Sequence, residues 1–215
     1  MVNQVMAEHL ADGRAIWLEP THLHFHRGDK VELKVLRGYA MQKAEMDGSE
    51  HLRGVAVNPE GAEIPVQISR GVDGAYDILV FNSGAEGIYT VQVENGPGPG
   101  KDYYARVLVP IGHHVHGAGK AMNRGLEIVP ETYGTFHPGE AVDLTVLYGG
   151  KPAAGAQVWA TYHLNEESGF SHTLQADEKG KVRFVFDAKG HWLFQTHVND
   201  NGTDHIATLV VPGVR

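Results

Sequence analysis

The sequence KVELKVL at residues 30–36 alternates apolar and polar side chains, which places Val31, Leu33 and Val35 on one side of an extended chain. This alternation is typical of a β-strand with one buried face. A similar pattern, VDLTVL, returns at residues 142–147. Each copy follows a turn with glycine and an acidic residue, HRGD at 26–29 and HPGE at 137–140. The pattern and its return predict a repeated all-β unit.

A further pair of matching segments precedes the two turns. WLEP at residues 17–20 is followed about 110 residues later by LEIVP at 126–130, a spacing too long for a solenoid and suited to tandem domains. We therefore predict two tandem immunoglobulin-like (Greek-key) β-sandwich domains. Their expected bounds are a disordered segment at 1–14, a first domain at 15–110, a His/Gly-rich connector at 111–125 and a second domain at 126–215. Expected strands cover residues 15–20, 21–25, 30–36, 55–57, 64–68, 76–81, 87–93, 103–109, 126–130, 142–147, 158–163, 172–175, 182–186, 191–198 and 205–211.

The composition of the 215 residues excludes several classes of function. The net charge of -8 argues against a nucleic-acid binder, which needs a clustered basic surface. With no cysteine, the chain forms no disulfide, thiolate metal site or iron–sulfur cluster. The first twenty residues lack an apolar core of secretory length, so we expect no signal peptide in this chain and no direct membrane insertion.

Histidine is the unusual component, with 14 copies. Neutral imidazole is a common ligand of transition metals, so this excess favours metal binding. The first candidate site is His113, His114 and His116 in the glycine-flanked connector IGHHVHGAGK at residues 111–120. Positions i and i+2 of an extended chain project to the same side, which lets two imidazoles meet one ion. The alternative is a solvated loop that binds metal only adventitiously, as a purification tag does.

Two further histidine groups are candidates. His22, His24 and His26 alternate with Leu23 and Phe25, so we expect them on the solvated face of a strand. His197 and His191 should face outward with Gln195, opposite a core face that carries Trp192 and Phe194. His163 and His172 join His197 in a second cluster if neighbouring strands bring them together. The run at 199–204 contains Asn201-Gly202 and is better explained by a hairpin turn than by a calcium loop.

Several segments together resemble a known family. They are WLEP at 17–20, LEIVP at 126–130, GGKPAAGAQV at 149–158, a Lys-Gly-Lys turn at 179–181 and GHWLFQTH at 190–197. This order resembles the NikM-like family of periplasmic components associated with cobalt/nickel ABC-type uptake. The resemblance implies two sandwich domains and a role in handling Ni²⁺ or Co²⁺ outside the membrane.

We therefore expect a non-catalytic, periplasmic or extracytoplasmic protein that binds Ni²⁺ or Co²⁺, or else Zn²⁺, for the membrane component of an ABC-type transporter. The predicted ligands are His113, His114, His116, His24, His26 and His197. Binding should weaken in acid, because protonated imidazole cannot coordinate. A different class of function remains open, a tandem sandwich that serves as an adhesion, carbohydrate-binding or scaffold module without a specific metal site.

Overall fold

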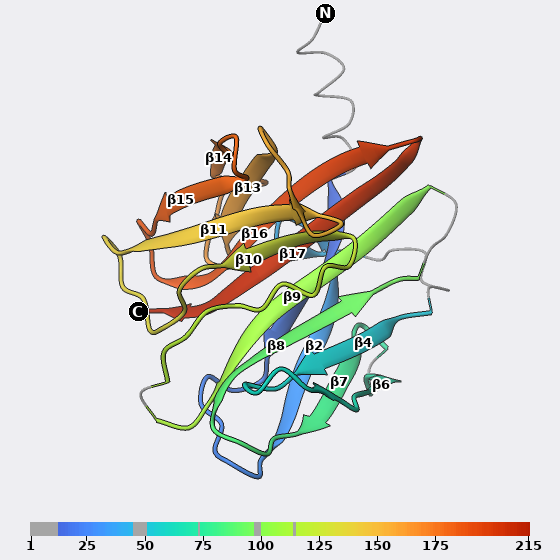
Figure 1. The fold of residues 1–215 in the computed structure, drawn as a ribbon, viewed down its shortest axis with the longest axis vertical. Coiled ribbons are helices and arrows are strands. Elements are labelled where there is room, and N and C mark those ends of the chain that lie inside the picture. Colours follow the sequence, from blue (N-terminus) through green and yellow to red (C-terminus); the bar gives the residue numbers. More distant parts are fainter. Residues whose placement is uncertain (1–12, 45–50, 73, 97–99, 114) are drawn as a thin grey trace, which may run out of the picture.

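Every regular element in the described part of the chain is a β-strand (Figure 1). The all-β, immunoglobulin-like β-sandwich prediction is confirmed. The structure is a computed structural model, and it describes residues 13–44, 51–72, 74–96, 100–113 and 115–215.

The strands fall on the two sides of the connector. Those before it are β1 (Arg14–Pro20), β2 (Lys30–Tyr39), β3 (Gln42–Lys43), β4 (Arg53–Val57), β5 (Glu63–Ile64), β6 (Gln67–Arg70), β7 (Asp77–Asn82), β8 (Gly87–Glu94) and β9 (Lys101–Ile111). Those after it are β10 (Leu126–Pro130), β11 (Ala141–Tyr148), β12 (Lys151–Pro152), β13 (Gln157–Tyr162), β14 (His172–Gln175), β15 (Lys181–Val185), β16 (Gly190–Asp200) and β17 (Thr203–Val214).

These strands form three sheets. The first sheet has the order β1-β2-β7-β6, with β3 paired to β2. The long sheet has the order β14-β13-β16-β17-β9-β8-β4-β5, and the third sheet contains β10, β11, β12 and β15. In the long sheet β17 pairs with β9 in parallel, from Asp204 opposite Lys101 to Val210 opposite Val107. The two halves of the chain are therefore joined by hydrogen bonds within one sheet.

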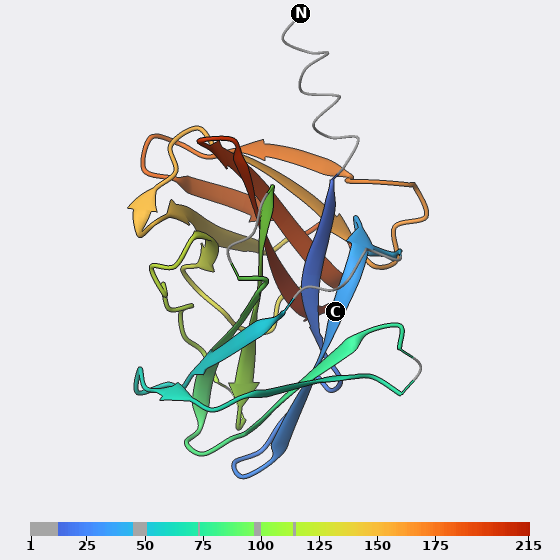
Figure 2. The same ribbon diagram turned by 90° about the vertical axis from the view of Figure 1, so that its right-hand side faces the viewer.

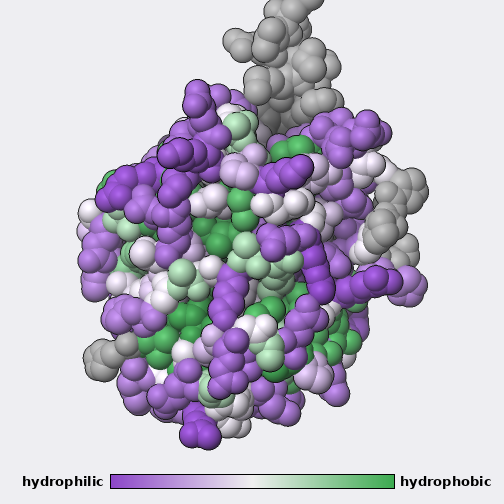
Figure 3. Space-filling view, viewed as in Figure 1, coloured by the Kyte–Doolittle hydropathy of each residue, from purple (hydrophilic) through white to green (hydrophobic). Residues whose placement is uncertain are grey.

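The first and third sheets cover opposite faces of the long sheet. Along β17, Ile206 and Val210 belong to the core under the first sheet, whereas Leu209 and Val211 belong to the core under the third sheet. Successive residues of a strand point to opposite faces, so this central strand is buried on both. Figure 2 shows β1 and β2, in blue, on one side of β17, in red, with the yellow strands of the third sheet on the other. Figure 3 shows a largely hydrophilic face on which apolar residues appear mainly in the hollows.

The alternation at residues 30–36 is confirmed, since Val31, Leu33 and Val35 are fully buried in β2. The predicted strand at 64–68 is wrong, because Pro65 lies between β5 in the long sheet and β6 in the first sheet. Proline has no N–H to donate to a sheet, so the pairing changes there. Strand β1 begins at Arg14, one residue inside the segment expected to be disordered, and residues 1–12 of that segment lie outside the described residues.

The predicted strand at residues 21–25 is also wrong. After β1 ends at Pro20, the chain makes only an isolated bridge between Phe25 and Ile111. His22 and His24 are exposed, but so is Leu23, which was expected on the buried side. The segment is therefore a loop fixed at one point, and its histidines do not share a regular strand face.

The outward face predicted for β16 is wrong as well. Gln195 is buried, and its Nε2 donates a hydrogen bond of 3.2 Å to the carbonyl oxygen of Gly13. Leu193, on the same face, packs into the core under the first sheet. A sandwich with one solvated face per sheet does not describe this region, because the long sheet is covered on both sides. The domain bounds at residues 110 and 126 stay predictions, since the two halves share that sheet.

The hairpin predicted at Asn201-Gly202 is confirmed. Asp200 at the end of β16 pairs with Thr203 at the start of β17. Both turn residues have positive φ, 50° for Asn201 and 84° for Gly202. This is the combination that a two-residue hairpin turn requires and that Asn-Gly adopts readily.

Candidate functional site

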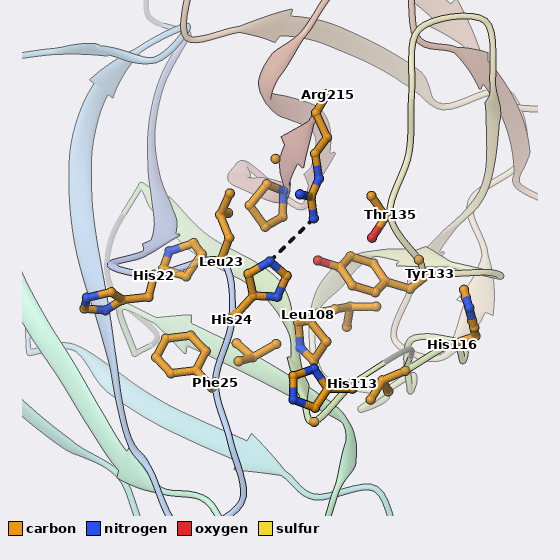
Figure 4. A pocket seen from close by; sticks show the side chains of 18 residues that line it. His22, Leu23, His24, Phe25, Leu108, His113, His116, Tyr133, Thr135 and Arg215 are labelled. Atoms are coloured by element: carbon orange, nitrogen blue, oxygen red, sulfur yellow. Dashed lines mark hydrogen bonds between the residues drawn. The ribbon is translucent and has the colours of Figure 1, made fainter.

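A cavity of about 340 Å³ lies where the loop after β1, the connector, the segment after β10 and the end of β17 meet (Figure 4). Four of the candidate histidines line it, His22 and His24 from the loop and His113 and His116 from the connector. Two groups that are far apart in the sequence are thus brought to one place. We call this cavity the junction pocket.

The loop after β1 is held against the start of the connector. The backbone N of Gly112 donates to the carbonyl oxygen of Phe25 over 2.9 Å, and the backbone N of His26 donates to Asp29 Oδ2 over 2.7 Å. As a result the rings of His26 and His113 lie edge to face, with centroids 5.3 Å apart. His26 does not line the junction pocket itself, but it contacts a residue that does.

The connector is packed against both halves of the chain. Val115 packs against a small cluster that contains Tyr133, and Gly117 forms a bridge with Tyr133. His116 lies against the backbone of Gly134, where an added Cβ would come within 3.0 Å of its Nδ1. His114, the third predicted ligand of the connector, lies outside the described residues.

A buried ion pair fixes the far end of the connector. Arg106 of β9 and Glu127 of β10 lie 3.1 Å apart, with 2% and 0% of their side chains exposed. Burial lowers the pKa of Arg106, and the adjacent carboxylate acts in the opposite direction. Arg106 also donates to the carbonyl oxygen of Lys120, and Glu127 accepts hydrogen bonds from the backbone N of Met122 and of Arg124. This pair ties the connector to both halves.

Three polar residues of the pocket wall are absent from the sequence-based prediction: Tyr133, Thr135 and Arg215. Figure 4 shows the Arg215 guanidinium directed toward His24, and the Arg215 NH2 group lies 3.5 Å from His24 Nε2. Burial raises the pKa of Tyr133, so its hydroxyl stays protonated at neutral pH. None of the three belongs to a recognisable sequence motif. Only the tertiary structure brings them close to the histidines.

The remaining candidates lie elsewhere, each with its own partner. His197 Nε2 is 3.0 Å from Asp204 Oδ1. His172 Nε2 is 3.1 Å from Asp187 Oδ2, and its ring packs against Phe184 and Trp192. The expected cluster of His163, His172 and His197 is therefore not formed in the described structure.

His163 instead meets His191, with ring centroids 4.6 Å apart. The Nδ1 of His163 accepts a hydrogen bond from the backbone N of His191, and the Nδ1 of His191 accepts one from the backbone N of Gly213. Each neutral ring therefore carries its proton on Nε2, so neither offers a free lone pair without breaking a backbone hydrogen bond. This arrangement is better suited to holding the strand ends together than to binding metal.

The environment of His191 leads us to predict how the stability of the fold changes in acid. Burial lowers the pKa of His191, with a further lowering from His163 and an opposing effect from Glu19. Because the unfolded chain binds this proton more readily, the contribution of His191 to stability is complete above the ordinary histidine pKa and is lost as pH falls through the lowered value. We expect the His191→Gln variant to lose less stability than the wild type when the pH is lowered from about 7.5 to about 5.5, two values on either side of the ordinary histidine pKa.

Urea unfolding at the two pH values measures this difference. The matched control is His51→Gln, since His51 is an exposed residue. Equal losses of stability in the wild type, His51→Gln and His191→Gln would contradict the prediction.

In the parts of the chain that the structure describes, no three His, Asp or Glu side chains are arranged to hold a metal ion. The junction pocket brings together the imidazoles of His22, His24, His113 and His116, which come from separate walls. Of these, His113 also contacts the ring of His26 at the rim of the pocket.

The family comparison covers most of the chain and ends before β17 (Thr203–Val214). Residues 11–200 match a domain of unknown function (DUF4198). The chain belongs to this family. The match contains the four histidines of the junction pocket, whereas Arg215 lies beyond its end. No curated protein matches the DUF4198 chain.

Solved structures are similar to the DUF4198 chain only at low identity. The D0-D1 domain of intimin is 13% identical with a TM-score of 0.28, and the match covers 92% of this chain and 98% of that one. An Escherichia coli alpha-2-macroglobulin is 14% identical with a TM-score of 0.36, covering 92% and 20% of the two chains. Mouse nectin-like molecule 4 is 11% identical with a TM-score of 0.28, covering 92% and 63%. The DUF4198 chain thus spans only a fraction of the macroglobulin.

No helix among the described residues of the DUF4198 chain is long and apolar enough to cross a membrane.

Proposed function

We propose that this protein is a non-catalytic, extracytoplasmic metal-binding protein that uses the junction pocket. It takes up a divalent transition metal, Ni²⁺ or Co²⁺ with Zn²⁺ as a further candidate, and presents it to the membrane component of an ABC-type transporter. The observation that carries the proposal is the convergence of His22, His24, His113 and His116 on one cavity.

The chemistry of the lining supports this role. Imidazole suits Ni²⁺, Co²⁺ and Zn²⁺, and a site at the meeting point of two structural units is a common place for a ligand. The resemblance of segments such as LEIVP and GHWLFQTH to nickel- and cobalt-associated proteins supports the choice of metal. The rival proposal of a sugar-binding surface would call for an exposed aromatic platform, whereas the large exposed hydrophobic residues of the described part are Leu23, Val72, Leu164 and Val185.

Replacing His113 and His116 together by alanine should weaken Ni²⁺ binding by at least about tenfold, because even changes outside the ligand set typically cost 10–100-fold in metal affinity. Isothermal titration calorimetry of tag-free protein with Ni²⁺, Co²⁺ and Zn²⁺ measures the effect. The matched control is the double substitution of His51 and His137, two exposed histidines outside the pocket, which should leave the affinity unchanged.

Two results would contradict the proposal. One is the absence of stoichiometric binding by the wild-type protein tighter than that of an exposed histidine tag. The other is an equal loss of affinity in the pocket variant and the control variant, which would mean that histidines bind metal without regard to their position.

A further inference from the structure

The turn of the hairpin between β16 and β17 consists of Asn201 and Gly202, and both residues are exposed. This end of the hairpin lies at the upper right of Figure 1. A Cβ added at Gly202 would meet no atom within 4 Å, and no backbone hydrogen bond to the described residues holds its N–H. The Asn201 side chain makes one hydrogen bond to the described residues, from its Nδ2 to Asp200 Oδ1 over 2.9 Å. The peptide N–H that follows Asn201 is therefore open to water.

An exposed asparagine followed by glycine can react with its own main chain. The backbone N of Gly202 loses its proton to water and forms a bond to Cγ of Asn201, while the bond from Cγ to Nδ2 breaks and Nδ2 takes up a proton and leaves as ammonia. Water then opens the cyclic imide at either of its carbonyl carbons, which gives aspartate or isoaspartate. The net change is the gain of water and the loss of ammonia. Glycine favours the attack because it has no Cβ to obstruct a close approach of the backbone.

A second Asn-Gly pair, at residues 95–96, is held differently. Asn95 Oδ1 accepts a hydrogen bond of 2.6 Å from the backbone N of Tyr103, and Asn95 Nδ2 donates one of 3.1 Å to the carbonyl oxygen of Lys101. The Asn95 amide must break both bonds before its Cγ can turn toward the next backbone N. The same dipeptide is thus protected at one place in the fold and unprotected at Asn201.

We propose that Asn201 is a site of spontaneous deamidation and that its conversion loosens the hairpin between β16 and β17. The site lies outside the junction pocket, so the inference does not depend on the proposed metal binding. Either product places a carboxylate beside Asp200, whose Oδ2 accepts a hydrogen bond of 2.8 Å from the Tyr148 hydroxyl, and like charges repel. Isoaspartate also lengthens the main chain of a tight turn, in a hairpin whose strand β17 belongs to both cores.

Ageing of the full chain at mildly alkaline pH, followed by proteolysis and tandem mass spectrometry, tests the reaction. In the folded protein we expect Asn201 to deamidate at least about tenfold faster than Asn95, because two hydrogen bonds hold the Asn95 amide. In protein unfolded by urea the two sites should react at similar rates, since glycine follows both. Asn95 is thus a matched control within the same chain.

Urea unfolding tests the consequence. Anion-exchange chromatography separates the aged form, which carries an added negative charge, from the unmodified protein. We expect the aged form to unfold at a lower urea concentration than the wild type, with the Asn201→Asp variant between them because it adds the charge without lengthening the main chain. Two results would overturn the inference: deamidation of Asn201 in the folded protein that is no faster than that of Asn95, or an aged form as stable as the wild type.

Discussion

Replacing Glu127 by alanine is expected to lower the free energy of unfolding by about 3–5 kcal/mol, the usual cost of removing one partner of a buried ion pair. The substitution leaves the Arg106 guanidinium, only 2% exposed, without its carboxylate. It also removes the acceptor for the backbone N of Met122 and of Arg124. Urea unfolding followed by circular dichroism measures the loss.

The matched control is Glu63→Ala, which removes the carboxylate of the exposed ion pair with Arg124. A surface pair contributes about 0–1 kcal/mol, so this variant should remain close to the wild type. The double variant Arg106→Met with Glu127→Leu should recover much of the loss, because it leaves no unpaired charge in the interior. Equal stabilities of Glu127→Ala and Glu63→Ala would show that the Arg106–Glu127 pair does not anchor the connector.

Replacing Leu209 by alanine should destabilise both halves of the chain, although its side chain packs only into the core under the third sheet. Truncating a fully buried leucine costs about 2–5 kcal/mol. Because β17 is hydrogen-bonded to β9 and carries Val210 in the other core, we expect the chain to unfold as one cooperative unit. The amide of Leu33 in the first sheet should then exchange with solvent at least tenfold faster, since about 1.4 kcal/mol corresponds to tenfold.

Hydrogen exchange followed by NMR measures this rate at Leu33 in the wild type and in the variant. The control is Leu164→Ala, the same substitution at a residue that is 58% exposed, where surface changes stay within about 0.5 kcal/mol. Faster exchange confined to β10–β17, with Leu33 unchanged in Leu209→Ala, would mean that the two halves open independently.

The histidines of the candidate site could be predicted from the sequence, but their meeting in one cavity could not. The excess of histidine and the spacing of His22, His24, His113 and His116 are visible in the sequence, and these four residues line one cavity. Their meeting depends on the bridge between Phe25 and Ile111, which residue spacing does not reveal. Arg215 was missed for the same reason, because it reaches the pocket only through the path of β17.

The sequence by itself determined most of the strands and, for strands such as β2, which side is buried. The alternation of Val31, Leu33 and Val35 and the Asn201-Gly202 turn act over a few residues, so local geometry is enough to predict them. Tertiary structure alone decided that β17 pairs with β9 and that both faces of the long sheet are covered. Pairing between distant strands depends on which surfaces meet after the chain has folded back on itself. For that reason Gln195 lies buried where its sequence pattern predicted solvent.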